Sequence, residues 1–421
     1  MKDSVDPSTS ATAKPQVPSY RWVVLAWICI CFFLFSANWY QVTAAFPPMI
    51  EDLHISAAEA GSLISVFILT YGLFQLPSGI LASRWSSKWT FIIGLLIESI
   101  CSSLIYFAPD YMTILILRLI AGIGGGLFFT AAVSTFVPWF LPTGQLGLAM
   151  GLTTTSFFFL GSSIPVMAGA PLIAMLGWRG YVLLLGVIGV IAAILAILIV
   201  RAPPKEILPP APPAAHKMSP SLSTVFKNVN IWLLGFGLMG AFGAYNTFYP
   251  YLPTFLTNFR GWDYAYANIF TATIGIISII VSPIVGLIVD KWRPRKPQLI
   301  LAAIVLAIHF WLYGQLGAPI MWILPIVTAI FSSFMTINAF SIPTDYLGPV
   351  LGSAGLGLLM EITMVAQTWI PIVYGMLIDM GVAQFGMTPE AASLAWLFLA
   401  VVSLTLAVFG AIIKEPRPRK D

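Results

Sequence analysis

Twelve apolar stretches, each long enough to cross a bilayer, constrain this chain more than any other feature. The hydrocarbon core of a membrane is about 30 Å thick, and a helix needs about 20 residues to span it. Only 9% of the 421 residues are charged, against about 25% in a soluble domain. We therefore expect a membrane protein. The stretches lie near residues 22–46, 57–82, 89–107, 111–137, 143–174, 178–200, 229–257, 262–289, 297–315, 319–344, 350–380 and 390–413.

The stretches are continuous runs of Leu, Ile, Val and Phe with internal Gly and Pro. Membrane-spanning strands would instead be segments of about 10 residues with alternating hydrophobicity. A helix satisfies all of its backbone hydrogen bonds internally, as lipid requires. The sequence therefore predicts an all-α membrane protein with 12 transmembrane helices.

Basic residues divide unevenly between the two sides of these spans. With the amino terminus in the cytoplasm, 17 of the 20 Lys and Arg residues fall on that face. Arg179 and Arg260 fall on the other face, and Arg118 lies within a span. Because cytoplasmic loops carry an excess of Lys and Arg, we expect a multi-pass protein of the cytoplasmic (inner) membrane with both termini in the cytoplasm. The bases are dispersed, so no nucleic-acid partner is expected.

One long hydrophilic segment, 202–228, interrupts the spans and contains seven prolines. Such proline density favours an extended connector over a folded domain. The expected organisation is six helices, a linker and six more helices. In residue numbers it comprises a disordered cytoplasmic tail at 1–20, an N-terminal bundle at 21–201, the cytoplasmic linker at 202–228, a C-terminal bundle at 229–413 and a cytoplasmic tail at 414–421.

The two halves repeat weakly in sequence. Residues 79–85, after the second span, align with 286–292, after the eighth, at an offset of 207. Near-constant offsets at separate places favour a duplicated, pseudo-symmetric six-helix unit. Paired repeats with a binding site near the membrane midplane are typical of secondary transporters. The other matches are Asn38 with Asn246 at an offset of 208 and Pro165 with Pro371 at 206.

With these repeats, the sequence resembles the major facilitator superfamily over about residues 21–413. The family loop pattern G-x-x-x-D-R-x-G-R-R/K is matched imperfectly by Gly79-x-x-x-Ser83-Arg84-x-Ser86-Ser87-Lys88, and Gly286-x-x-x-Asp290-Lys291 keeps the acid. The fourth span carries Arg118-x-x-x-Gly122-x-Gly124, similar to the family's R-x-x-x-G-x-G. The resemblance implies two six-helix bundles around a central cavity, and transport by alternating access. The fifth span lacks the family's antiporter Gly-Pro signature, which favours uptake over export.

Three ionisable side chains lie inside predicted spans, where such groups are rare and functional by default: Glu98, Arg118 and Glu361. Glu98 and Arg118 lie on consecutive spans. They could form a structural ion pair, or Arg118 could face the cavity as an anion-binding or coupling cation. A carboxylate buried without a cation favours its protonated form. We therefore take Glu361 as the first candidate for proton coupling, and Glu98 and Arg118 as two further candidates. The alternative for Glu361 is a hydrogen bond between helices.

Neutral polar side chains form the predicted substrate-binding set together with Arg118. Residues three or four apart share a helical face, and amides inside lipid must face other helices or a wet cavity. Each residue is at least as well explained by helix packing as by ligand contact. Spans one and seven line the cavity in the family that the chain resembles, which favours Asn38 and Asn246. The set is Asn38, Gln41, Tyr71, Gln75, Tyr245, Asn246, Tyr249, Asn338 and Gln367.

The loop motifs predict a cytoplasmic gate, where charge pairs between helix ends could hold one access state closed. Its predicted members are Gly79, Arg84, Gly286, Asp290, Lys291 and Arg295. A role of the bases in membrane topology is compatible with this.

No nucleophile–base set, metal-ligand spacing or nucleotide motif is recognisable, so we expect no cofactor, no metal and no enzymatic activity. The sequence favours a secondary active transporter that moves a small polar or anionic organic solute by proton-coupled symport. The expected partners are the solute, protons and the lipid bilayer, and a monomer suffices. The alternatives are a drug or metabolite exporter and a non-transporting membrane sensor.

Overall fold

Helices make up nearly all of the structure, a computed structural model that describes residues 18–140, 143, 145–202, 204, 222–292, 294–317 and 320–415. The helices are α1 (Arg21–Leu53), α2 (Ala57–Leu73), α3 (Gln75–Leu81), α4 (Ser87–Leu104), α5 (Tyr111–Phe140), α6 (Leu146–Met150), α7 (Phe158–Ile199), α8 (Leu222–Phe226), α9 (Val229–Arg260), α10 (Tyr264–Lys291), α11 (Arg295–Gln315), α12 (Leu324–Ala366), α13 (Ile370–Phe385), α14 (Ser393–Ser403) and α15 (Thr405–Ile412).

Eleven helical segments of the described chain are long and apolar enough to cross a membrane. One of them, Leu148–Ile199, has 52 residues and would be about 78 Å long if straight, more than twice the bilayer core. It bends at Gly177, where φ is 69° and ψ is 165°, a conformation that glycine adopts most readily. The bend separates the predicted spans 143–174 and 178–200, so the prediction of twelve spans is confirmed.

Helix α12 also contains more than one span, since Ile320–Leu347 and Gly355–Phe385 are separate crossing segments. A Cβ on Gly355 would lie 3.3 Å from the Cβ of Pro343. In a straight helix these positions would be about 18 Å apart. The chain therefore folds back between them, and α13 continues the second of the two spans.

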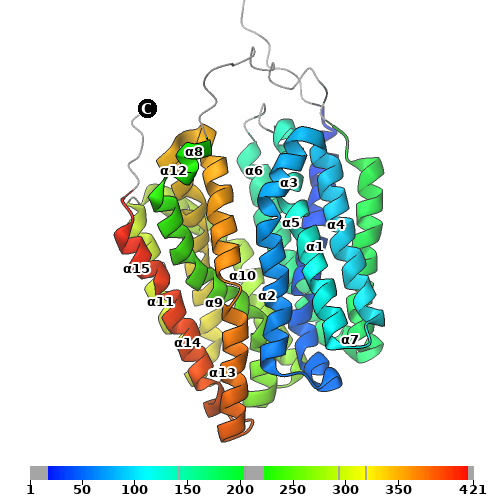
Figure 1. Cartoon of the computed structure of the whole chain (residues 1–421), viewed down its shortest axis with the longest axis vertical. Helices are drawn as coiled ribbons and strands as arrows, with labels where there is room; N and C mark the ends of the chain where they lie inside the picture. The colour runs from blue at the N-terminus through cyan, green and yellow to red at the C-terminus, as the bar shows by residue number, and fades with distance from the viewer. Residues whose placement is uncertain are drawn as a thin grey trace, which may run out of the picture.

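Each half of the chain begins and ends at the same face of the molecule. In the first half, Tyr20 Oη donates to Ile199 O at 2.7 Å. In the second half, Lys414 N donates to Asn230 Oδ1 at 3.0 Å. Each half therefore crosses an even number of times. We call this face, at the top of Figure 1, the inner face and the opposite one the outer face.

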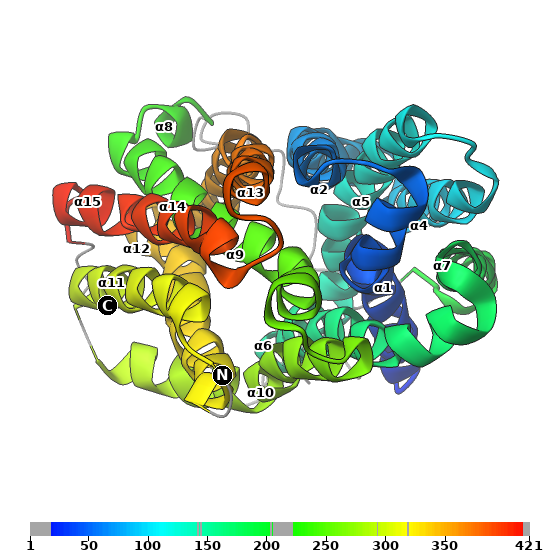
Figure 2. The same ribbon diagram turned by 90° about the horizontal axis from the view of Figure 1, so that it is seen from below.

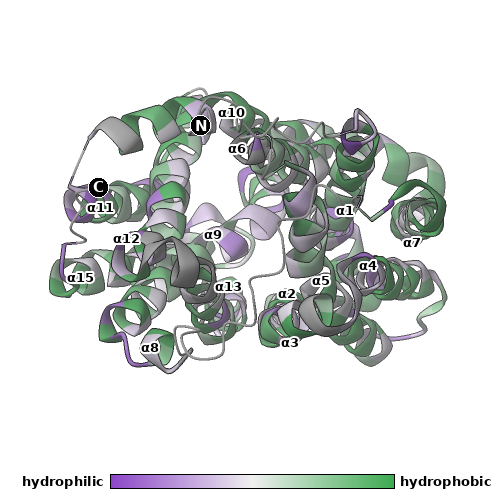
Figure 3. Cartoon of the chain, turned by 90° about the horizontal axis from the view of Figure 1, so that it is seen from above, coloured by the Kyte–Doolittle hydropathy of each residue, from purple (hydrophilic) through white to green (hydrophobic). Residues whose placement is uncertain are grey.

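Two groups of helices lie side by side, α1–α7 in one and α9–α15 in the other (Figure 2). Seen from above, hydrophobic ribbon predominates on the helices at the periphery, and hydrophilic ribbon gathers near α9 at the centre (Figure 3). Side chains such as Leu198 and Ile280 are 70% and 68% exposed, as expected where lipid rather than water surrounds the helices.

The pseudo-symmetry of the halves is visible in matching contacts. A Cβ on Gly79 would lie 3.6 Å from Thr130 Cγ2, and one on Gly286 would lie 3.8 Å from Ile337 Cδ1. Both members of the second pair are 207 residues beyond those of the first. This is the offset of the sequence repeat, so the two pseudo-symmetric bundles are confirmed.

The segments outside the spans differ locally from expectation. Residues 18–20, within the predicted disordered tail, form a turn that leads into α1. The end of the predicted linker forms the short helix α8. The rest of the predicted tails and linker, 1–17, 203, 205–221 and 416–421, lies outside the described residues.

Candidate functional site

The two bundles meet along an interface that we call the seam. At the outer face, the seam is closed by Asp379 of α13. Its carboxylate accepts hydrogen bonds from the backbone N–H groups of Ala57 at 2.9 Å and Ala58 at 3.0 Å. These are the first amides of α2, which have no partner within their own helix. A helix N-terminus also favours negative charge. Asp379 therefore connects the C-terminal bundle to the N-terminal one.

Two tyrosines of the C-terminal bundle strengthen the same seam. Tyr251 Oη donates to Ala57 O, and Tyr264 Oη donates to Ala44 O. Pro48 has no N–H, so it leaves the carbonyl of Ala44, one turn earlier in α1, free to accept from Tyr264. The position of a proline in one bundle thus creates an acceptor for the other.

An aromatic cluster lies on the inner side of these contacts. The rings of Tyr40 and Tyr249 meet edge to face across the seam, with centroids 5.3 Å apart. Tyr245 stacks on Tyr249 at 6.2 Å, and Tyr249 Oη donates to Ser162 O at 3.4 Å. The predicted residues Tyr245 and Tyr249 therefore do lie between the bundles.

Asn246, from the same predicted group, turns into its own bundle. Its Nδ2 donates to Gln367 Oε1 at 3.0 Å, and both residues are buried. The structure thus brings two predicted amides together, from α9 and from the link between α12 and α13. In this state their hydrogen bond joins helices within the C-terminal bundle.

Arg118 of α5 is buried and contacts backbone carbonyls of two other helices. Nε donates to Leu63 O at 3.3 Å, Nη1 to Asn38 O at 3.4 Å and Nη2 to Trp39 O at 3.4 Å. The guanidinium also lies over the Phe67 ring, 4.4 Å from its centroid. An arginine has five N–H donors, so these three long contacts do not exhaust its capacity. Arg118 forms no ion pair within the described residues.

The glycines of the arginine motif explain how Arg118 reaches these carbonyls. A Cβ on Gly122 would clash with Phe67 O of α2, and one on Gly124 would lie 2.5 Å from Glu98 N of α4. Because both positions lack a side chain, α5 packs closely between α2 and α4. Arg118, one turn before Gly122, is thereby held against α1 and α2.

Glu98 is completely buried, and neither carboxylate oxygen has a hydrogen-bond partner among the described residues. The ion pair with Arg118 that the sequence left open is not formed.

Two predicted binding residues lie near Glu98 on α1 and point into the same bundle. Asn38 Nδ2 donates to Leu34 O at 3.0 Å, and Gln41 Nε2 donates to Ser102 Oγ at 3.0 Å. Asn38 and Asn246 therefore do not face each other in this state.

Tyr71 and Gln75 lie on either side of the short break between α2 and α3. Gln75 Oε1 accepts from Thr130 Oγ1 at 2.5 Å, which joins the second and fourth spans. The Tyr71 ring packs against Trp39, with centroids 4.8 Å apart. Both predicted residues are buried in the N-terminal bundle.

Glu361 of α12 is half-buried and has no hydrogen bond or ion pair within the part of the chain that the structure describes. One turn further along the helix, Met364 and Val365 lie against Gly72 of α2, with Met364 Cβ 2.9 Å from the position of a Cβ on Gly72. Residues four apart share a helical face. Glu361 therefore lies at the seam, about 5 Å closer to the inner face than this contact.

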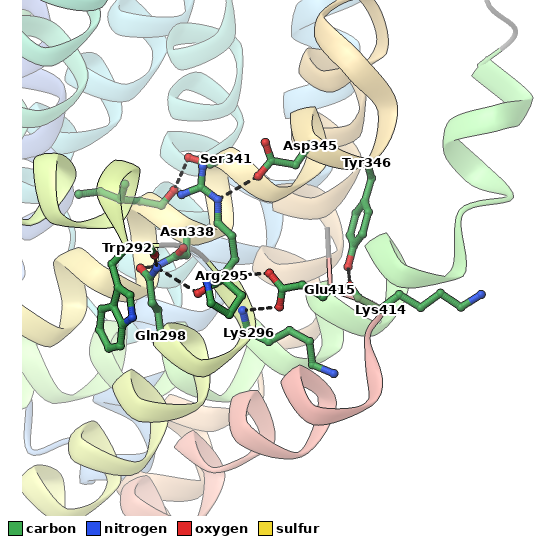
Figure 4. A network of polar contacts seen from close by, with 12 residues as sticks. Trp292, Arg295, Lys296, Gln298, Asn338, Ser341, Asp345, Tyr346, Lys414 and Glu415 are labelled. Atoms are coloured by element: carbon green, nitrogen blue, oxygen red, sulfur yellow. Dashed lines mark hydrogen bonds and ion pairs between the residues drawn. The ribbon is translucent and has the colours of Figure 1, made fainter. Parts of the chain in front are cut away.

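The predicted inner gate is in part a network within the C-terminal bundle (Figure 4). Arg295 Nε pairs with Asp345 Oδ2 at 2.9 Å, which joins α11 to α12. The same figure shows that Asn338 belongs here, since its Nδ2 donates to Gln298 Oε1 at 3.1 Å. Glu415 accepts from the Arg295 and Lys296 backbone amides.

The side chains of Arg84, Asp290 and Lys291, also predicted for the gate, lie outside the described part. The two gate glycines, Gly79 and Gly286, pack against the fourth and tenth spans as described above.

Sequence reasoning did not identify Asp379, Tyr251, Tyr264, Asp345 or Glu415. Only Pro48 gave a usable signal, because a proline inside a helix always frees the carbonyl four residues earlier. Within the described residues, no group of three or more His, Cys, Asp or Glu is placed to hold a metal ion.

Known proteins with similar sequences are transporters. The chain is 25% identical over 384 residues to a probable sulfoacetate transporter, SauU, of Cupriavidus necator, covering 85% of this chain and 87% of that protein. It is 26% identical over 280 residues to a hexuronate transporter of Bacillus subtilis, covering 63% and 64% of the two chains.

Solved structures share the fold at low identity. A bacterial homologue of the human lysosomal transporter Spinster, in an inward-facing and occupied conformation, superposes with a TM-score of 0.76 at 17% identity, covering 94% of this chain and 97% of that one. A D-xylose-proton symporter gives 0.73 at 16%, covering 94% and 99%.

The family model of the Major Facilitator Superfamily matches residues 28–366, which is most of the chain. Relatives and family are transporters and not enzymes. With twelve spans in two repeated bundles, the chain belongs to the major facilitator superfamily of membrane transporters.

Proposed function

We propose that this chain is a proton-coupled symporter for a small organic anion, working by alternating access with both termini in the cytoplasm. The observation that carries the proposal is Glu361, a carboxylate inside a membrane span, half-buried at the seam between the bundles and without a partner in the described residues. Titratable groups that face the interior of a transporter are typical proton carriers.

The seam contacts support the coupling role of Glu361. The outer side is closed by Asp379, Tyr251 and Tyr264. Glu361 lies on the inner side of the Gly72 contact with Met364. A proton on Glu361 would therefore exchange with the inner face in this state. Rocking of the bundles would expose the same carboxylate to the outer face, which is the essence of alternating access.

The solute class rests on the relatives and on Arg118. Sulfoacetate and hexuronate, the solutes in the names of two relatives, are both anions with a carboxylate. Arg118 provides a buried cation whose three carbonyl contacts are long, between 3.3 and 3.4 Å. A planar guanidinium matches a carboxylate in bidentate geometry. We propose that Arg118 turns from the carbonyls to the solute when the solute enters.

Transport into proteoliposomes tests the proposal. Radiolabelled sulfoacetate and glucuronate would be offered to vesicles with an alkaline interior. We expect accumulation that collapses when a protonophore removes the gradient. The Glu361→Gln variant should lose accumulation but keep exchange of labelled for unlabelled solute, because exchange needs no net proton movement. Glu51→Gln, which alters an exposed glutamate of α1, is the matched control.

Two outcomes would overturn the proposal. If Glu361→Gln accumulated solute as the unaltered protein does, the proton site would lie elsewhere. If the labelled solute were extruded against the gradient, the chain would be an exporter.

A further inference from the structure

A groove of about 640 Å³ lies at the inner face of the C-terminal bundle, away from the seam. It is formed where α9 begins and α15 ends. Lys227 precedes α9, and Lys414 follows α15, so two ammonium groups border the groove. Val229, Leu233 and Ile412 form its apolar part. The proposed transport function does not use this groove.

The two lysines of the groove are exposed, and neither ammonium group has a partner within the described residues. Other lysines at this face are engaged. Lys88 Nζ donates to Ile197 O at 2.8 Å, and Lys296 Nζ donates to Ala411 O at 2.9 Å. The groove therefore holds two positive charges that remain free to meet an anion.

The neighbouring acid does not neutralise these charges. Glu415 follows Lys414, but its oxygens accept from the backbone amides of Arg295 at 2.7 Å and Lys296 at 3.1 Å. Figure 4 shows the Lys414 side chain extending away from the Glu415 carboxylate. Among the residues that the structure describes, no acidic side chain lines the groove.

The polar wall of the groove is fixed by hydrogen bonds. Asn228 Oδ1 accepts from Asn230 N at 3.1 Å and so caps α9. Asn230 Oδ1 in turn accepts from Lys414 N at 3.0 Å. These bonds hold Lys227 and Lys414 on opposite sides of one groove without using their ammonium groups.

The apolar wall continues into the surface that faces lipid. Val229 is 64% exposed and Ile412 58%, and Phe226 beside them is also exposed. Trp232, which donates through Nε1 to Phe226 O at 2.9 Å, is of the residue type that favours the membrane–water boundary. A soluble anion would make no use of this wall, whereas acyl chains would cover it.

We propose that this groove binds the phosphate headgroup of an anionic phospholipid. Lys227 and Lys414 hold the phosphate, and the acyl chains lie along Val229, Leu233 and Ile412. Basic pockets between membrane helices are known to recognise lipid headgroups in this way.

Native mass spectrometry tests the proposal with full-length protein from vesicles of mixed phosphatidylglycerol and phosphatidylcholine. We expect the unaltered protein to retain phosphatidylglycerol preferentially. The double variant K227Q/K414Q should lower this preference roughly 30-fold, the effect of two lysines near a membrane surface. K227R/K414R, which keeps both charges, should retain it. K205Q/K217Q removes the same charge from the linker and should have no effect.

Three results would overturn the proposal. The first is an unchanged lipid preference in K227Q/K414Q. The second is an equal loss in K205Q/K217Q, which would mean that only net charge matters. The third is displacement of the bound lipid by inorganic phosphate as readily as by phosphatidylglycerol, which would assign the groove to a soluble anion.

Discussion

Removal of the Asp379 carboxylate should open the outer side of the seam. The carboxylate is the acceptor for two backbone amides of α2, at 2.9 and 3.0 Å. Each hydrogen bond to a charged group contributes about 1.5–3 kcal/mol when well shielded. Asp379 is half-buried, so solvent screens part of this. We expect Asp379→Ala to destabilise the closed state by about 2 kcal/mol. The ratio of closed to open state then falls about 30-fold.

The rate at which a cysteine at position 254 reacts with a membrane-impermeant maleimide measures this ratio. Thr254 lines a small cavity of about 20 Å³ at the outer seam, between Ala57 of one bundle and Tyr374 of the other. A thiol there reacts only when the bundles separate. The native cysteines, Cys29, Cys31 and Cys101, are buried, and protein without the added cysteine gives the background.

The labelling rate should rise about 30-fold in Asp379→Ala. Asp379→Asn keeps one acceptor oxygen and should give an intermediate rate. Glu390→Gln removes an exposed outer-face charge and should leave the rate unchanged. An unchanged rate in folded Asp379→Ala would refute the reasoning, because it would mean that other contacts alone hold the seam closed.

Two further perturbations test the packing on each side. Gly375→Ala would place a Cβ against Ala57 O, and an overpacking cost of about 1–3 kcal/mol should speed labelling of the same cysteine by at least about fivefold. Arg295→Gln should lower the unfolding free energy by about 3 kcal/mol, because the pair with Asp345 is largely buried, at 4% and 17% exposure. Thermal unfolding in detergent measures this loss, and an unchanged melting temperature would contradict it.

The sequence predicted the architecture well because its causes lie in the order of residues along the chain. An apolar run of bilayer length must form a helix, and an offset of 207 residues between 79–85 and 286–292 reflects two copies of one fold. The contacts of Gly79 and Gly286 reproduce that offset in space. Both properties are visible in a single chain without knowledge of which helices are neighbours.

The candidate site was harder to predict, because the direction of a side chain depends on its neighbours. Asn38 and Asn246 occupy equivalent positions in the repeat, yet Asn38 bonds to a carbonyl of its own helix and Asn246 bonds to Gln367. An amide inside lipid must find a partner, but the sequence does not say whether that partner is a ligand or a helix. Asn338 donates a hydrogen bond to Gln298 for the same reason.

The contacts across the outer seam share a feature that explains why no pattern revealed them. Side chains of the C-terminal bundle contact the backbone of the N-terminal bundle: Asp379 contacts amides of α2, and Tyr251 and Tyr264 contact carbonyls of Ala57 and Ala44. Backbone groups have no residue-type signature. The side chains at positions 44 and 57 should therefore matter little for closure.

This asymmetry makes a prediction that separates backbone from side-chain recognition. Ala44→Gly removes the side chain but keeps the carbonyl that Pro48 frees, so labelling at position 254 should be unchanged. Tyr264→Phe deletes the donor to that carbonyl and should speed labelling several-fold, since a hydrogen bond contributes about 1 kcal/mol. If Ala44→Gly opened the seam as much as Tyr264→Phe, closure would depend on the fit between side chains. The proline-freed carbonyl would then have no part in closing the seam.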